Sequence, residues 1–203
     1  MSKQKGWAYI LIGQNQDYTL VIGPYNFEVV RSFSYLGSII NENQDEEEEV
    51  RSRIAAGNRA YFSIVSKLVS RSTMFTLYET LIRPVVTYGG ETWTLSNKRI
   101  NLLDRFERVI LRDRMREWYC RRRKNGELFG LYKECSISSY IRIQRLKWLG
   151  HVLKISEERV ADKLYSYVPD GVRQRDRPKG RWKDDVRRDL RQLRIPVTFT
   201  EDR

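Results

Sequence analysis

The sequence contains very little cysteine and histidine. Among its 203 residues are 2 cysteines, Cys120 and Cys135, and 1 histidine, His151. A disulfide framework or a complete zinc site needs more ligands than this set can supply. We therefore expect no metal and no cofactor. So few cysteines are typical of a protein with reduced thiols, and we expect an intracellular location, either nuclear or cytoplasmic.

Long apolar runs are also missing. No stretch approaches the roughly 18 consecutive apolar residues that a membrane-spanning helix requires. The start from Met1 to Lys5 is not followed by the apolar core and cleavage site of a signal peptide. We therefore expect no membrane partner.

Positive charge is what the chain has in excess. Lysine and arginine total 38 against 26 acidic residues, for a formal net charge of +12. Residues 1–100 carry 11 basic and 10 acidic side chains, whereas residues 101–203 carry 27 and 16. This imbalance favours a polyanionic partner for the second half of the chain, although a solvated basic face without a partner is the simpler alternative.

Strand patterns are confined to the N-terminal region. The segments Trp7–Ile12 and Tyr18–Ile22 are rich in β-branched and aromatic residues and flank a polar turn, which predicts a hairpin. The stretches "FEVV" and "FSYLGSII" predict one or two further short strands, with a bend at Gly37.

Helical spacing dominates from Glu46 onward. Four glutamates, Glu46 to Glu49, suit the positive end of a helix dipole. Consecutive helical positions point in different directions, so we expect a solvated helix start rather than a metal site. Further helices are predicted over 73–87, where Pro84 kinks or ends the helix, 96–118 with Ser96 as N-cap, a short stretch in "ELFGLYKEC", 138–154, 157–165 and 182–193.

The expected fold is therefore α+β and mainly α. A small N-terminal antiparallel hairpin or meander should precede a helical bundle and a basic helical C-terminal region. In the 96–118 helix the expected core stripe is Leu102, Leu103, Phe106, Val109, Ile110 and Met115. In the 138–154 helix we expect an apolar side facing inward, made of Ile141, Leu146, Leu149 and Val152, and a basic side facing outward, made of Arg142, Arg145, Lys147 and Lys154.

Four segments, taken in order, resemble one protein family. They are "FEVVRSFSYLGSIINENQDEEEEVRSRIAAGNRAYFSI", "LYETLIRPVVTYGGETWTLSNKRINLLDRFERVILR", "RIQRLKWLGHVLKISEERVADKL" and "RPKGRWKDDVRRDL". Together they resemble the carboxyl-terminal part of the reverse transcriptase of non-LTR (LINE-type) retrotransposons. The resemblance runs from about residue 18 to about residue 194.

The resemblance implies a division of the chain into three regions. Residues 1–42 would be a palm remnant with a primer-grip-like hairpin, 43–118 a thumb-like helical region, and 119–203 a basic helical region. The stretch "FSYLG" is similar to the motif at the base of the palm whose hairpin grips the primer strand. "YGGETW" matches a thumb-region signature, with Gly90 at a position where the family usually has a small residue. The hairpin residues implied to contact nucleic acid are Phe33, Tyr35 and Gly37.

The basic segments are the other candidate contacts. "RLKWLGHVLK" and "RPKGRWKDD" resemble segments beyond the thumb that are implied to handle template RNA or target DNA. Arginine can bind phosphate through two parallel hydrogen bonds, and tryptophan can stack on unpaired bases. The candidate residues are Arg145, Lys147, Trp148, His151, Arg177, Lys179, Arg181 and Trp182. The alternative for both tryptophans is a core anchor flanked by exposed charges. The sequence favours this alternative for Trp148, because Leu146 and Leu149 share its helix, and leaves it open for Trp182.

A further basic run lies near the start of the third region. It consists of Arg121, Arg122, Arg123 and Lys124. These residues suit phosphate contact or a nuclear localisation signal, and a plain solvated loop explains them equally well.

The chain departs from the family at the residues that carry catalysis. In these polymerases the catalytic aspartates lie on palm strands upstream of "FSYLG". Here the 32 residues before Phe33 contain only Asp17 and Glu28 as acids, and neither lies in such a motif. Phosphoryl transfer by two metals needs converging carboxylates, and neither an endonuclease constellation nor a cysteine–histidine knuckle is present. We therefore expect no enzymatic activity.

The sequence thus predicts a non-catalytic, transposon-derived remnant that binds RNA, DNA or both. The missing palm and fingers of a reverse transcriptase are a further expected partner. One alternative is a helical protein-interaction or assembly module, in which a sheet edge exposes Tyr9, Ile10 and Val21. Another is a decayed remnant without a selected role.

Overall fold

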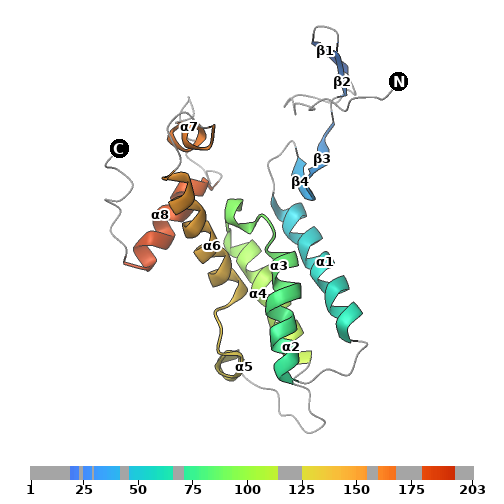
Figure 1. Cartoon of the computed structure of the whole chain (residues 1–203), viewed down its shortest axis with the longest axis vertical. Helices are drawn as coiled ribbons and strands as arrows, with labels where there is room; N and C mark the ends of the chain where they lie inside the picture. The colour runs from blue at the N-terminus through green and yellow to red at the C-terminus, as the bar shows by residue number, and fades with distance from the viewer. Residues whose placement is uncertain are drawn as a thin grey trace. The chain divides into compact units, whose positions relative to one another are not determined.

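The computed structural model describes residues 19–22, 25–28, 30–41, 46–65, 71–113, 125–154, 160–167 and 180–194. The chain divides into two units, Met1–Ser52 and Arg53–Arg203. The strands belong to the first unit, and helices make up most of the described residues (Figure 1). The expected fold class, mainly α with a small antiparallel β-region near the N-terminus, is confirmed. The region boundaries expected after residues 42 and 118 remain predictions.

The first unit contains two antiparallel hairpins. β1 (Thr19–Ile22) pairs with β2 (Tyr25–Glu28), and β3 (Ser32–Tyr35) pairs with β4 (Ser38–Asn41). The strand expected over residues 18–22 therefore pairs with the one that follows it along the chain. The strand expected over residues 7–12 lies outside the described residues.

The turn between β3 and β4 has an unusual backbone. Leu36 has a φ of 48° and Gly37 a φ of 83°. Two consecutive positive φ angles twist a two-residue turn in the same sense as the flanking strands, which is why such turns suit hairpins. Gly37 adopts this conformation without a steric penalty, so the expected bend lies where the sequence predicted it.

The glutamate run starts α1 (Glu46–Val65), as predicted. Glu47 forms an ion pair with Arg51 one turn later, at 2.8 Å. Glu49, in contrast, is buried, and its Oε2 accepts a hydrogen bond from the Ile39 amide at 2.7 Å. The expectation of a fully solvated run is therefore wrong for Glu49, because its carboxylate satisfies a backbone amide of β4.

The helical segment 71–86 changes its hydrogen-bond pattern before a proline. α2 (Arg71–Leu77) leads into a π-helical turn, η1 (Tyr78–Ile82), and then into α3 (Arg83–Val86). The Arg83 amide donates to the Tyr78 carbonyl, which is the wide spacing of a π-turn. Pro84 has no N–H to donate and clashes with a regular preceding turn. The wider turn accommodates it, and the helix continues to residue 86.

α4 (Asn97–Asp113) begins where the sequence predicted it. The Ser96 Oγ accepts a hydrogen bond from the Arg99 amide at 3.4 Å, which confirms Ser96 as the N-cap. Leu103, Phe106 and Ile110 of the expected stripe are buried, but Val109 is 58% exposed. Each residue advances about 100° around a helix, which takes Val109 off the buried face. Residues 114–118 of this predicted helix lie outside the described residues.

Gly57 allows α1 to approach α3 and α4 closely. A Cβ atom at this position would lie 2.3 Å from Val86 Cγ2 and 2.9 Å from Phe106 Cζ. Both distances are shorter than van der Waals contact, so only glycine fits the helix crossing as it stands.

A buried glutamate connects three helical elements of the second unit. Glu107, on α4, accepts a hydrogen bond from Tyr78 Oη at 2.9 Å and one from the Ile137 amide at 3.0 Å. Burial raises the pKa of Glu107, while these two hydrogen bonds oppose that shift. Glu107 thus joins η1 and α4 to the start of α6 (Ile137–Val152), and the apolar stripe of α4 did not reveal this role.

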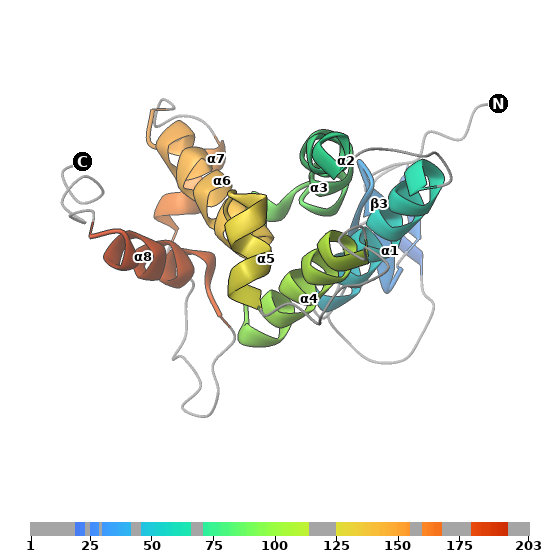
Figure 2. The same ribbon diagram turned by 90° about the horizontal axis from the view of Figure 1, so that it is seen from below.

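The C-terminal helices follow the predicted order. They are α5 (Asn125–Tyr132), α6, α7 (Val160–Ser166) and α8 (Trp182–Gln192). α6 lies beside α8 in both views (Figures 1 and 2). Leu149 of α6 packs with Val186 and Leu190 of α8 in an apolar cluster. This cluster joins α6, which carries the candidates Arg145, Lys147, Trp148 and His151, to α8, which begins with the candidate Trp182.

Candidate nucleic-acid interface

A mostly apolar groove lies where α6, α7 and α8 meet. Its volume is about 770 Å³. Four aromatic residues line it: Trp148 on α6, Tyr165 on α7, Tyr167 just after α7, and Trp182 at the start of α8. We call this site the aromatic groove. It brings together the two tryptophans that the sequence analysis selected from separate segments.

The two tryptophans have different environments. Trp148 is 37% exposed, and its ring lies 5.2 Å from the His151 ring, centroid to centroid. Trp182 is held more firmly, because its Nε1 donates to the Glu91 carbonyl at 2.7 Å and its ring meets Tyr165 edge to face at 6.3 Å. Trp182 is therefore partly a core anchor, whereas Trp148 offers an accessible aromatic surface.

Positive charge surrounds the groove. Arg181, Lys183 and Arg187 contribute to its lining, and Arg181 and Arg187 are exposed. The Lys183 ammonium lies 4.7 Å from the centroid of the Tyr165 ring, which is close enough for a cation–π interaction. Burial lowers the pKa of Lys183, and the nearby Arg187 charge lowers it further. Among the described residues of the lining, Asp184 is the one acidic residue.

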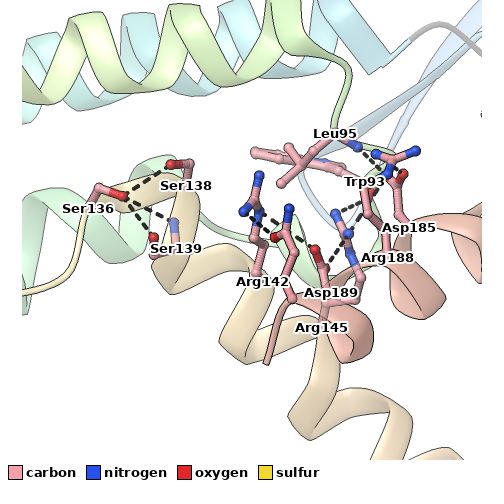
Figure 3. Close-up of polar contacts among 11 residues, drawn as sticks. Trp93, Leu95, Ser136, Ser138, Ser139, Arg142, Arg145, Asp185, Arg188 and Asp189 are labelled. Carbon is pink, nitrogen blue, oxygen red and sulfur yellow. Dashed lines mark hydrogen bonds and ion pairs between the residues drawn. The ribbon is translucent and has the colours of Figure 1, made fainter. Parts of the chain in front are cut away.

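Beneath the surface, a buried arginine ties α6 to α8 (Figure 3). Arg145 is 1% exposed and lies 2.8 Å from Asp189 Oδ2 and 3.6 Å from Asp185 Oδ2. Its Nη2 also donates to the Trp93 carbonyl at 2.8 Å. Asp185 accepts a further hydrogen bond from the Leu95 amide at 2.7 Å. The network therefore fixes α6, α8 and the segment after η2 (Gly90–Thr92) to one another.

Burial and ion pairing shift the pKa values of the groups in this network in opposite directions. Burial lowers the pKa of Arg145, and the carboxylates of Asp189 and Asp185 oppose that change. Burial also raises the pKa of Asp189, and the guanidinium groups of Arg145 and Arg142 oppose it. An arginine remains protonated under such conditions, so the groups form a hydrogen-bonded ion network.

The expectation that Arg145 faces outward is wrong. It lies one helical turn from Ile141 and one from Leu149, both buried, and so occupies the same buried face of α6. Its two terminal nitrogens donate to Asp189 and to the Trp93 carbonyl, and the buried side chain leaves no access for a phosphate. Arg145 supports the groove and is withdrawn as a contact residue.

The other predicted contacts fall into three groups. Trp148, Arg181 and Trp182 line the aromatic groove, and the exposed Lys147 and His151 lie next to Trp148 on α6. The hairpin candidates are in the first unit, where Gly37 forms the turn, Tyr35 is exposed and Phe33 is half-buried. The candidates outside the described residues are Arg121, Arg122, Arg123, Lys124, Arg177 and Lys179.

Sequence reasoning missed several residues of the groove. Lys183 and Arg187 lie one turn apart on α8, so helical spacing alone places them on one face. Tyr165 ends the helix predicted over 157–165 and Tyr167 follows it, but neither residue was predicted as a contact. Their proximity to Trp182 depends on how α7 packs, which no local pattern encodes.

The described residues contain neither a cluster of metal ligands nor a helix that could span a membrane. Within those ranges, histidine, cysteine, aspartate and glutamate form no group of three or more that could hold a metal ion. The helices of the described part of the chain are also too short or too polar to cross a membrane.

Comparison with known proteins gives no relative. The chain matches no protein-family model, no curated protein and no solved structure.

Proposed function

We propose that this protein is a non-catalytic RNA- or DNA-binding fragment derived from a LINE-type reverse transcriptase. The observation that carries the proposal is the aromatic groove, in which Trp148 and Trp182 meet the cations of Arg181 and Arg187. Aromatic rings stack on bases, and arginine binds phosphate, so this combination suits a nucleic acid. The ordered sequence resemblance supports the same class of ligand.

The charge distribution is consistent with this proposal. Residues 101–203, which contain the groove, carry 27 basic and 16 acidic side chains. Several of the acids in this half are buried and paired: Glu107 binds a backbone amide and a tyrosine, while Asp185 and Asp189 bind Arg145. The ion pairs also occupy Arg142, Arg145 and Arg188, so the charge offered to a polyanion comes from exposed residues of the groove such as Arg181 and Arg187.

The same pairing supports the absence of polymerase activity. Two-metal phosphoryl transfer needs carboxylates that are free to converge on the metals. The buried Glu49, Glu107, Asp185 and Asp189 already accept hydrogen bonds from backbone amides or from Arg145. We expect no template-dependent extension of a primer with magnesium or manganese. Any such synthesis by the purified chain would overturn this part of the proposal.

A salt titration tests the binding. The purified chain is titrated against fluorescently labelled RNA and DNA at several salt concentrations, and anisotropy reports the dissociation constant. If about six phosphates of a duplex are neutralised, log affinity should fall against log salt with a slope of about −5. Binding that does not respond to salt, or no binding at low salt, contradicts the proposal.

Exposed apolar residues on the hairpin favour a second candidate, a protein-assembly module. Tyr35, Leu36 and Ile40 are all exposed, and Leu36 is 73% exposed. Apolar side chains gathered on a short hairpin are typical of an interaction surface. Light scattering after size-exclusion chromatography distinguishes the candidates, because a monomer at high protein concentration argues against assembly of this chain with itself.

A further inference from the structure

The aromatic groove combines aromatic rings with positive charge, and few ligands can contact both. The described part of its lining is mostly apolar and includes four aromatic rings, while Arg181, Lys183 and Arg187 add positive charge and Asp184 adds one negative charge. A cationic ligand would be repelled, and a small inorganic anion would leave the rings unused. A ligand that is both flat and anionic uses the whole surface, and a nucleotide has that combination.

The accessible surface of the groove determines which form of nucleic acid can use it. Trp148 is exposed enough to stack, whereas Trp182 is already hydrogen-bonded to Glu91 and packed against Tyr165. A base can stack on Trp148 only if its own face is uncovered. In a duplex every internal base face is covered by its neighbours, and opening the stack costs a few kcal/mol per step.

The size of the groove also favours unpaired nucleotides over a duplex. Its volume of about 770 Å³ is within the range of sites that bind small organic molecules. Such a space accepts one or two nucleotides. A closed double helix would meet only the exposed cations, such as Arg181 and Arg187, and would leave the aromatic lining in water.

We infer that the aromatic groove binds unpaired nucleotides of a single strand and discriminates against a closed duplex. A base stacks on Trp148, and the neighbouring phosphates contact Arg181 and Arg187. The inference rests on the proposed function and goes beyond it by specifying the strand state and the residues that distinguish base from phosphate.

The experiment compares ligands that separate the base from the phosphate. The full chain is titrated by anisotropy with a 12-nucleotide single strand, with an abasic strand of equal length, and with a dumbbell duplex whose ends are closed. Stacking of one base changes affinity by roughly tenfold or more, so the single strand should bind at least about tenfold tighter than either other ligand. Equal affinity for all three ligands overturns the inference and leaves the proposed function intact. No binding to any of them refutes the proposed function itself.

Substitutions of Trp148 test whether this residue stacks on a base. Trp148→Ala should weaken single-strand binding about tenfold and leave duplex binding unchanged, while Trp148→Phe should retain most of the affinity because a ring remains. Phe62→Ala is the matched control, since Phe62 is an exposed aromatic residue that does not line the groove. An equal effect of Trp148→Ala on single strand and duplex, or no effect on either, contradicts the inference.

The salt dependence of single-strand binding tests the phosphate contacts separately. Arg187→Ala should make the salt slope for the single strand less negative by about 0.7, the value expected for one phosphate contact. Arg105→Ala, an exposed arginine of α4 outside the groove, is the control and should leave the slope unchanged. Urea unfolding of each variant shows that the fold is retained, and an unchanged slope for a folded Arg187→Ala protein contradicts the assigned phosphate contact.

Discussion

Replacing Arg145 with methionine tests whether the buried ion network holds α6 and α8 together. The side chains of Arg145, Asp189 and Asp185 are 1%, 5% and 7% exposed. Methionine fills most of the space of the arginine stem but removes the buried guanidinium from both carboxylates. Asp189 then keeps only the more exposed Arg142, and Asp185 only the exposed Arg188. The Trp93 carbonyl also loses its donor at 2.8 Å.

The expected magnitude follows from the cost of an unpaired buried charge. Removing one partner of a buried ion pair typically lowers the free energy of unfolding by about 3–5 kcal/mol. For a domain whose total stability is about 5–15 kcal/mol, that loss is a large fraction. Arg142→Met is the matched control on the same helix, because Arg142 is 32% exposed and lies 3.6 Å from Asp189. A partly solvated pair of this kind contributes about 1 kcal/mol or less.

Urea unfolding followed by circular dichroism measures the difference. Without Arg145, Asp189 should take up a proton more readily in the folded protein, so the native state binds more protons than the unfolded state. Stability then falls as pH rises, and the loss caused by Arg145→Met should be smaller in acid than at neutral pH. Arg145→Met combined with Asp189→Leu should recover part of the loss, because the uncompensated charge is removed. If Arg145→Met costs no more than Arg142→Met, the network does not carry the stability assigned to it.

Three further substitutions test the fold at separate points. The raised pKa of Glu107 means that its contribution is greatest below its ordinary value of 4.5 and declines as pH rises through the folded value. Glu107→Gln should therefore flatten the pH dependence of the urea midpoint, and parallel profiles would contradict this. Gly57→Ala should lower the free energy of unfolding by about 1–2 kcal/mol because of overpacking against Val86. In a Val86→Ala background Gly57→Ala should cost less than it does in the natural sequence, and an equal cost in both backgrounds would refute the steric explanation. Leu36→Asn should stabilise the β3–β4 hairpin by about 1 kcal/mol, because asparagine before Gly37 suits a turn with two positive φ angles. Hydrogen exchange of the hairpin amides measures this change, and unaltered protection would argue against it.

Much of the local structure could be predicted from sequence patterns. Ser96 marks the start of α4 because its hydroxyl can accept a hydrogen bond from the first turn, and that bond is present. The glutamates at the start of α1 and the glycine of the β3–β4 turn follow from equally local rules. The two tryptophans could be selected as candidates because basic residues flank them in the sequence.

The sequence pattern also indicated that Arg145 is buried, although we expected it to face outward. Arg145 falls between Ile141 and Leu149 at one-turn spacing, which places it on the apolar face of α6. Asp185 and Asp189 occupy the buried face of α8 beside Val186 and Leu190 in the same way. A charged residue inside an apolar stripe indicates a buried partner. The identity of that partner was not readable, because Arg145 and Asp189 are 44 residues apart.

By itself, the sequence determined the elements that depend on neighbouring residues: the helices and their caps, the tight hairpin turn, and the concentration of positive charge in the second half. Only the tertiary structure decided which charges became internal and which aromatic rings shared one groove. Helix periodicity and capping act over a few residues, whereas the pairing of Arg145 with Asp189 and the meeting of Trp148 with Trp182 require separate helices to pack. That packing depends on the complementary shape and charge of faces distant in sequence.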